Sequence, residues 1–364
     1  MKIQAIETFY VAVPLTKPFK TALRTVTTAF SVVVKVTSDE GKVGYGEAPP
    51  THVITGESLE SIQYAINEII SPQLIGLSLL EKEIIFQKLH KALVRNTSAK
   101  AAVDMAIFDL LGQYAELPLY QYLGGYRNSL TTDFTVSVNE PAEMAEDAER
   151  YVREGFQILK VKVGIGTIQE DIERIEAIRR RVGKDIKIRL DANQGWNAKE
   201  AVRAIGTMED TGLNIEFVEQ PVPAEDLEGL KYVTERTATP IMADESVFSI
   251  YDAKRVLEMR AADLINIKLM KSGGIYQALK INTLAEANDI TCMVGSMIET
   301  KIGITAAAHL AASQPNILFY DFDAPLMLAE DIVTGGIIYQ ASTMTFSKSY
   351  GLGIASVKIG EGQK

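Results

Sequence analysis

From about residue 130 onward, short apolar segments alternate regularly with amphipathic segments, and this alternation constrains the fold more than any other feature. The apolar segments have the length and the β-branched content of buried strands. Two of the amphipathic segments begin with the spacing of a helix capping box, at Thr167 with Glu170 and at Asn197 with Glu200. The predicted strands are TDFTVSV, QILKVKV, IKIRLD, IEFVE, PIMAD, LINIKL, TCMVGS and ILFYDFD.

The polar residues at the ends of these strands recur at nearly constant intervals. Intervals of 24 to 28 residues separate Asp191, Glu219, Asp244, Lys268, Ser296 and Asp321. A strand, a helix and two loops fill such an interval, and eight of these units close a barrel. Alternating strands and helices could also form an open doubly wound sheet, but the Gly-rich dinucleotide fingerprint is absent. We therefore predict an α/β fold of the TIM-barrel type.

The chain is long enough for a second, smaller domain before the barrel. Its 364 residues exceed the roughly 300 at which single cores stop growing. Residues 1 to about 55 have strand character, and the segment AAVDMAIFDLLGQYAEL has helical spacing until Pro118 stops it. We predict an α+β domain over residues 1–125 and a barrel over residues 126–344.

Composition excludes several classes of protein. The net charge of −10 argues against nucleic acid, whose binding proteins carry a basic stripe. The single cysteine, Cys292, excludes an intramolecular disulfide, and the three histidines lie too far apart for a zinc site. Neither a signal peptide nor a membrane-spanning run is recognisable. A cytoplasmic enzyme without a membrane partner is the expectation.

Three carboxylates are predicted to converge on one point at the C-terminal ends of neighbouring strands. These are Asp191, Glu219 and Asp244. Buried charges are costly unless they are paired or bound to metal, and hard oxygen ligands suit Mg²⁺ or Mn²⁺ better than zinc. Such a cation can stabilise the charge that develops on a bound substrate carboxylate. One Mg²⁺ ion is therefore the expected cofactor, with Mn²⁺ as the alternative.

Lysines flank these carboxylates on strands before and after them. Because strand side chains alternate in direction, Lys160 and Lys162 share one face, and Lys268 lies four strands further around the ring. Burial and like charge, here from Lys160 beside Lys162 with a divalent cation close by, are expected to lower lysine pKa values toward the range of a general base. Two lysines on opposite sides of one carbon can remove a proton from one face and return it to the other, which is epimerisation.

With these motifs the chain resembles the enolase superfamily, and within it the muconate-lactonising-enzyme subgroup. The resemblance covers essentially the whole chain, and it rests on KVKVG at 160–164, DANQGW at 191–196, EFVEQPVP at 216–223, MADES at 242–246 and INIKLMKSGG at 266–274. It implies a modified (β/α)₇β barrel beneath an α+β capping domain, which the C-terminal tail at about 345–364 completes.

The resemblance also implies roles for individual residues. Asp191, Glu219 and Asp244 would be Mg²⁺ ligands, as the superfamily's chemistry suggests. Lys162 and Lys268 would be the acid/base pair. Lys160 would neutralise the enolate and bind the substrate carboxylate, and Asn193 would orient Asp191.

The end of the eighth strand narrows the substrate class. Asp321 and Asp323 share a face and make a site for a positive charge, which resembles the family's epimerases acting on L-Ala-D/L-Glu dipeptides. The expected reaction is epimerisation at the C-terminal residue of such a dipeptide, with breakdown of murein peptides as the implied setting. Arg24 would then bind the distal carboxylate, for which Lys17, Lys20 and Lys301 are alternatives. Thr135 and Ser296 are further candidates for substrate contacts.

Other readings stay open at this point. A lyase or cycloisomerase, an o-succinylbenzoate synthase or an N-acylamino acid racemase of the same subgroup would use the same metal and lysines. A Schiff-base aldolase with Lys268 as nucleophile would not need the three carboxylates. A binding protein that has lost its chemistry would bind metal without turnover. An assembly of identical subunits is the expected oligomeric state.

Overall fold

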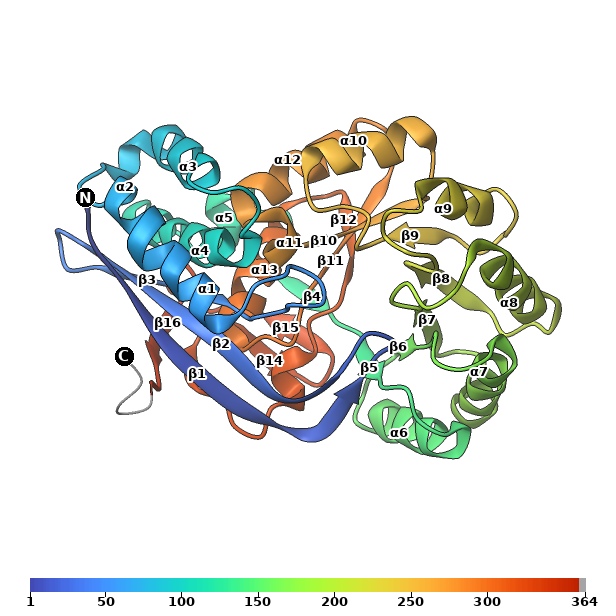
Figure 1. Ribbon diagram of the computed structural model, residues 1–364. Coiled ribbons are helices and arrows are strands. Elements are labelled where there is room, and N and C mark those ends of the chain that lie inside the picture. The colour runs from blue at the N-terminus through green and yellow to red at the C-terminus, as the bar shows by residue number, and fades with distance from the viewer. Residues whose placement is uncertain (360–364) are drawn as a thin grey trace.

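Eight parallel strands, arranged in the order of the chain, form the curved central sheet (Figure 1). The computed structural model describes residues 1–359; residues 360–364, the end of the predicted tail, lie outside the described part. Neighbouring strands pair in parallel, as the alternating pattern predicted. The strands are β5 (Phe134–Val136), β6 (Ile158–Lys162), β7 (Lys187–Asp191), β8 (Ile215–Glu219), β9 (Ile241–Ala243), β10 (Leu264–Lys268), β11 (Thr291–Gly295) and β12 (Ile317–Tyr320).

Helices fill the seven connections between these strands and cover the outside of the sheet (Figure 1). The capping boxes predicted at Thr167 and Asn197 are both present and begin α7 and α8. The predicted (β/α)₇β arrangement is thereby confirmed. The helices are α6 (Pro141–Arg153), α7 (Ile168–Val182), α8 (Ala198–Asp210), α9 (Leu227–Thr234), α10 (Ile250–Met259), α11 (Leu269–Ser272), α12 (Ile275–Glu286) and α13 (Lys301–Ser313).

The first and last strands meet at a seam that side chains hold together. In the described residues β5 and β12 are the two ends of the sheet, and no backbone ladder joins them. Instead, Thr132 Oγ1 accepts a hydrogen bond from Phe322 N at 2.8 Å. Asp323 Oδ2 accepts another from Thr135 N at 2.5 Å. Polar side chains therefore replace part of the missing ladder.

The N-terminal region forms a separate antiparallel sheet covered by helices. Its strands are β1 (Ile3–Lys20), β2 (Thr25–Ser38) and β3 (Val43–Ala48). Helix α4 (Thr97–Tyr114) packs on β3 so closely that a Cβ at Gly46 would stand 1.9 Å from Ala102 O. The remaining helical segments are α1 (Leu59–Tyr64), η1 (Ala65–Ile70), α2 (Ser71–Leu74), η2 (Leu79–Glu81), α3 (Lys82–Lys91) and α5 (Leu119–Tyr122).

The C-terminal segment returns to this capping region. Leu352 N donates to Asp109 Oδ1 on α4 at 2.9 Å, and Leu119 N donates to Gly351 O at 2.7 Å. The tail thus contacts the cap as expected, while the domain limits at residues 125 and 344 stay a prediction. Among residues 1–359 no helix is both long and apolar enough to cross a membrane. The remaining elements are β4 (Ser129–Thr131), η3 (Ala324–Met327), β13 (Val333–Gly335), β14 (Ile338–Gln340), β15 (Thr343–Thr345) and β16 (Ile354–Val357).

Candidate active site

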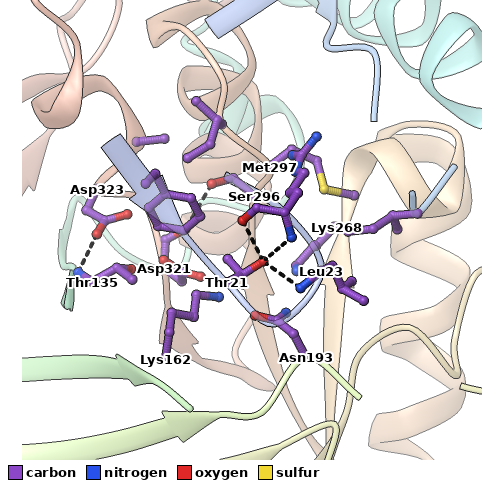
Figure 2. A pocket seen from close by; sticks show the side chains of 15 residues that line it. Thr21, Leu23, Thr135, Lys162, Asn193, Lys268, Ser296, Met297, Asp321 and Asp323 are labelled. Carbon is purple, nitrogen blue, oxygen red and sulfur yellow. Dashed lines mark hydrogen bonds between the residues drawn. The ribbon is translucent and has the colours of Figure 1, made fainter. Parts of the chain in front are cut away.

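A pocket lies at the C-terminal ends of the barrel strands, beneath the turn between β1 and β2. A backbone hydrogen bond joins this turn to the barrel: Val138 N, just beyond β5, donates to Lys20 O at 3.3 Å. Figure 2 shows residues from both regions around one space. The cap contributes Phe19, Thr21, Leu23, Arg24 and Ile54. The barrel contributes Thr135, Lys162, Asn193, Lys268, Ser296, Met297, Ile298, Asp321, Asp323 and Ala324.

The three predicted carboxylates all lie at strand ends and are fully buried. Asp191 and Glu219 are the last residues of β7 and β8, and Asp244 directly follows β9. Lys162 and Lys268 end β6 and β10, and in Figure 2 they enter the pocket from different sides. The convergence expected from a barrel with charged strand ends is therefore present.

Each carboxylate is paired with lysine ammonium groups. Lys160 Nζ lies 2.8 Å from Asp321 Oδ2, 2.8 Å from Glu219 Oε2 and 3.2 Å from Asp191 Oδ2. Lys162 Nζ lies 2.6 Å from Asp191 Oδ2. These contacts form one continuous network of opposite charges inside the barrel, so none of the three strand-end carboxylates is left without a positively charged partner.

The lysine pKa values do not follow the expectation from sequence. Burial alone would lower the pKa of Lys160, but Asp321, Glu219 and Asp191 together raise it well above its ordinary value. Lys268 behaves in the same way: its pKa is raised against the effect of burial, because Asp244 Oδ2 lies 2.6 Å away. In this arrangement of charges the neighbouring carboxylates outweigh burial at both lysines, and the lowering expected beside a divalent cation stays a prediction.

The carboxylates divide into two kinds. Burial acts to raise the pKa of Asp191, but Lys162 and Lys160 outweigh it and lower the value to about 2. Burial, followed by the charge of Asp191, raises the pKa of Glu219 to about 7. Three acids placed so close together cannot all remain ionised without compensating positive charge.

The donor set suits a divalent cation. Only carboxylate oxygens are offered by the three strand-end acids, as hard cations require. Glu219 Oε2 and Asp244 Oδ1 accept no hydrogen bond from residues 1–359, although each faces a lysine ammonium, at 2.8 and 2.7 Å. The described residues contain no group of three such side chains already arranged around one point, and the acids face lysines. The assignment of Asp191, Glu219 and Asp244 as metal ligands stays a prediction that the chemistry of the donors fits.

The two acids after β12 both line the pocket, but each has an oxygen engaged elsewhere. Asp321 Oδ2 accepts from Lys160 Nζ, and Asp323 Oδ2 accepts from Thr135 N. Burial, followed by the charge of Asp321, raises the pKa of Asp323 to about 7. A cation placed between them would relieve this repulsion, as the sequence suggested.

Of the other residues predicted to contact the substrate, some line the pocket and some do not. Arg24 lines the pocket half-buried, and no carboxylate of residues 1–359 forms an ion pair with it. Ser296 also lines the pocket and donates to Asp321 O at 3.4 Å. The alternatives to Arg24 lie outside the pocket: Lys17 is bound to Asp147, Lys20 to Asn139 and Lys301 to Asp331.

Asn193 contacts its expected partner through the backbone. Its N–H donates to Asp191 Oδ1 at 2.9 Å, whereas its side-chain nitrogen lies 3.4 Å from Glu245 Oε1. Asn193 has a left-handed φ of 41°, which turns the chain sharply after β7. Its support of Asp191 therefore comes from main-chain geometry.

Two buried residues of the quoted motifs support Asp244, and the sequence predicted no role for them. Gln220 accepts from Asp244 N at 2.8 Å and donates to Ser246 Oγ at 2.9 Å. Lys271 Nζ lies 2.7 Å from Asp244 Oδ1 and also donates to Val247 O at 3.0 Å. Both follow a predicted strand-end residue by one or three positions, and that proximity was the available signal.

Comparison with known proteins places this chain in a family. Residues 5–124 match the family described as mandelate racemase / muconate lactonizing enzyme, N-terminal domain, and residues 143–357 match the enolase C-terminal domain-like family. The chain therefore belongs to the mandelate racemase/muconate lactonizing enzyme family of the enolase superfamily. The resemblance drawn from its motifs is confirmed.

Individual relatives cover the whole chain. It is 61% identical to an L-Ala-D/L-Glu epimerase of Bacillus subtilis over 100% of both chains. A substrate-liganded structure of the Bacillus subtilis L-Ala-D/L-Glu epimerase has a TM-score of 0.98, covering 98% of this chain and 99% of that one. A dipeptide epimerase of Enterococcus faecalis, complexed with Mg and the dipeptide L-Leu-L-Tyr, is 47% identical with a TM-score of 0.94, covering 98% and 100%.

Proposed function

We propose that this enzyme is an isomerase that epimerises a dipeptide, with L-Ala-D-Glu and L-Ala-L-Glu as the pair to test first. One observation carries the proposal: the acidic pair Asp321 and Asp323 lines the same pocket as Lys162 and Lys268. An acidic pair recognises a free α-ammonium group, which a dipeptide has and an N-acylated amino acid lacks. The similarity to dipeptide epimerases supports the same substrate class.

The lysines account for the chemistry. One of Lys162 and Lys268, as a neutral amine, takes the α-proton of the C-terminal residue, and the C–H electron pair moves toward its carboxylate to give an enolate. The other lysine, as an ammonium group, returns a proton to the opposite face. The atoms and charges balance, and only the configuration at that carbon changes. Lys160, which is wholly buried behind them, would compensate the negative charge.

The carboxylates would hold the cofactor. Asp191, Glu219 and Asp244 are proposed to bind one Mg²⁺ ion, with Mn²⁺ as a substitute. When bound, such an ion stabilises negative charge on the substrate carboxylate. The Mg present in the Enterococcus faecalis dipeptide epimerase complex supports this assignment.

The remaining substrate contacts follow from the pocket. Arg24 is proposed to bind the side-chain carboxylate of the Glu residue, and Thr135 and Ser296 to make polar contacts with the peptide. An assembly of identical subunits and a cytoplasmic location are kept as proposals from the sequence.

The deciding experiment is proton NMR in D₂O. Enzyme, Mg²⁺ and L-Ala-D-Glu or L-Ala-L-Glu should give loss of the Glu α-proton signal and appearance of the other diastereomer. Retention of that signal with active, metal-loaded protein would reject the dipeptide assignment. N-acylamino acids would be the next substrates to test, because an N-succinyl-L-Arg/Lys racemase of Bacillus cereus is 38% identical over 97% of this chain and 95% of its own.

A further inference from the structure

Glu47 is a capping-region carboxyl that lies completely buried against the barrel. It belongs to β3, and its oxygens accept hydrogen bonds from Thr300 Oγ1 at 2.9 Å, Thr300 N at 3.2 Å and Gly303 N at 2.6 Å. Thr300 is the N-cap residue of α13. A residue of the cap thus supplies the acceptor for free N–H groups at the start of a barrel helix, where a negative charge is favourable.

The segment that Glu47 holds forms one wall of the pocket. It connects β11 to α13, and its residues Ser296, Met297 and Ile298 line the pocket. The next residue, Glu299, accepts a hydrogen bond from Met297 N at 2.9 Å and so fixes the turn from within. The pocket wall is therefore anchored at its far end by a residue 253 positions earlier in the chain.

Glu47 and Glu299 meet beside Gly303. A Cβ built on Gly303 would stand 2.1 Å from Glu299 Oε2 and 3.0 Å from Glu47 Oε1, so both carboxyls face the same point. Among residues 1–359 neither acid forms an ion pair with a lysine, arginine or histidine. Two such groups cannot both be charged at low cost.

The surroundings of Glu47 and Glu299 favour a state in which the two carboxyl groups together carry one proton. Burial, followed by the charge of Glu47, raises the pKa of Glu299 to about 8; the Met297 N–H and Lys268 act against this, and Asp321 acts in the same direction. Burial also raises the pKa of Glu47, but donors from Gly303, Thr300 and Ser31 act to lower it. Of the two side chains, Glu47 is therefore favoured in the charged form and Glu299 in the protonated form.

We propose that Glu47 is a positioning residue for substrate binding: from the capping region it holds the 296–298 pocket wall in place, with a protonated Glu299 as its partner across Gly303. The substrate part of this inference rests on the proposed dipeptide epimerase function. The capping region would then shape the pocket in two ways. Its turn between β1 and β2 covers the site, and Glu47 holds the barrel segment 296–298 in place.

Asp104 provides a matched control. It also lies fully buried in the cap, on α4, and accepts hydrogen bonds from Ile275 N at 2.6 Å and Tyr276 N at 3.3 Å, at the start of α12. It thus makes the same kind of contact between cap and barrel, but not through a pocket-lining segment. A comparison of the two separates positioning of the pocket from simple docking.

The experiment compares Glu47→Ala and Asp104→Ala by hydrogen–deuterium exchange and by kinetics. In Glu47→Ala, exchange in 296–303 should accelerate, and KM for the dipeptide should rise about tenfold with kcat changed by less than about threefold. In Asp104→Ala, 296–303 should stay protected and KM should stay within about twofold of wild type, whatever the loss of Tm. Protection of 296–303 in Glu47→Ala, or equal KM changes in both variants, would overturn the proposal.

The exchange measurement needs no substrate, so it decides the positioning role even if the dipeptide assignment fails in the NMR experiment. If Glu47→Ala does not fold, Glu47→Gln replaces it, since it keeps one acceptor oxygen. Glu299→Gln tests the proton: Gln imitates the neutral acid, so 296–303 should stay protected and KM should change by less than about twofold. Loss of protection in Glu299→Gln would contradict a protonated Glu299.

Discussion

Asp323 Oδ2 accepts a hydrogen bond from the backbone N–H of Thr135 at 2.5 Å, across the seam where the first and last barrel strands meet without a ladder. The same residue lines the pocket beside Asp321. Asp323, which is proposed to bind the substrate, therefore also helps to join the two ends of the sheet, and its place at this seam brings it to the pocket. Substitutions of Asp323 must be chosen so that these two roles are measured separately.

Asp323→Asn removes the charge and keeps an oxygen that can accept from Thr135 N. KM for L-Ala-L-Glu should rise about tenfold or more, because an α-ammonium loses one charged partner. Any activity on N-acylated amino acids should be unchanged, since these lack the ammonium. Steady-state kinetics with both substrate types checks this, with the exposed Asp185→Asn as control. An unchanged KM for the free dipeptide would contradict the ammonium site.

The convergence of the site could be predicted because it follows from simple periodicities. Strand side chains alternate, and parallel strands of a barrel end on one face, so Asp191, Glu219 and Asp244 had to meet near Lys162 and Lys268. Five motifs placed these residues at strand ends without any knowledge of loop conformation. The fold followed from the same regular spacing.

The pairing inside the site could not be predicted, because it depends on which of several nearby groups are closest in space. The sequence shows Lys160 beside Lys162, which suggested a lowered pKa, but it does not show Asp321 at 2.8 Å, 161 residues away. The contact of Glu47 with Thr300 spans 253 residues and has no periodic signal. The hydrogen bond of Asp323 across the seam could be predicted only if it were known that no backbone ladder joins β5 and β12.

Lys162→Ala and Lys268→Ala should each abolish epimerisation in both directions, with turnover lowered at least about 10³-fold, because one proton transfer loses its donor or acceptor. One variant can still exchange the α-proton of a single diastereomer in D₂O, since the other lysine remains. Deuterium incorporation into each diastereomer, followed by NMR, measures this. Lys254→Met, at an exposed position, is the control. Full epimerisation by either lysine variant would remove the two-base mechanism.

Chelation of divalent cations should stop turnover, and added Mg²⁺ or Mn²⁺ should restore it. A cation that binds only the folded chain also stabilises it, by about 2.7 kcal/mol at a concentration of 100 Kd. Tm should therefore rise with Mg²⁺ concentration, and Glu219→Gln should reduce this rise. Thermal unfolding and activity are measured on the same samples. Undiminished turnover in excess chelator would exclude the proposed metal site.

His309 should make the protein less stable as the pH falls. Burial lowers its pKa to about 3 in the folded chain, against about 6.5 when unfolded, and its Nδ1 accepts from Tyr120 N at 2.8 Å. Below pH 6.5 the unfolded chain takes up a proton that the folded chain does not, so the free energy of unfolding falls with falling pH. His309→Gln should lack this component, about 1.2 kcal/mol between pH 6 and 5. Parallel slopes in denaturant titrations of both proteins would refute it.

Lys271→Met should weaken metal binding although it replaces none of the proposed ligands. Lys271 holds Asp244 by its carboxylate and Val247 by its carbonyl, and Met has similar length but cannot donate. Loss of such a support lowers metal affinity by about 10–100-fold in other sites, so a shift of that size in the Mg²⁺ concentration for half-maximal activity is expected. Calorimetric titration with Mg²⁺ gives the affinity independently of turnover. Lys254→Met should leave both values unchanged, and an unchanged Mg²⁺ affinity in Lys271→Met would show that Lys268 and Gln220 hold Asp244 well enough without Lys271.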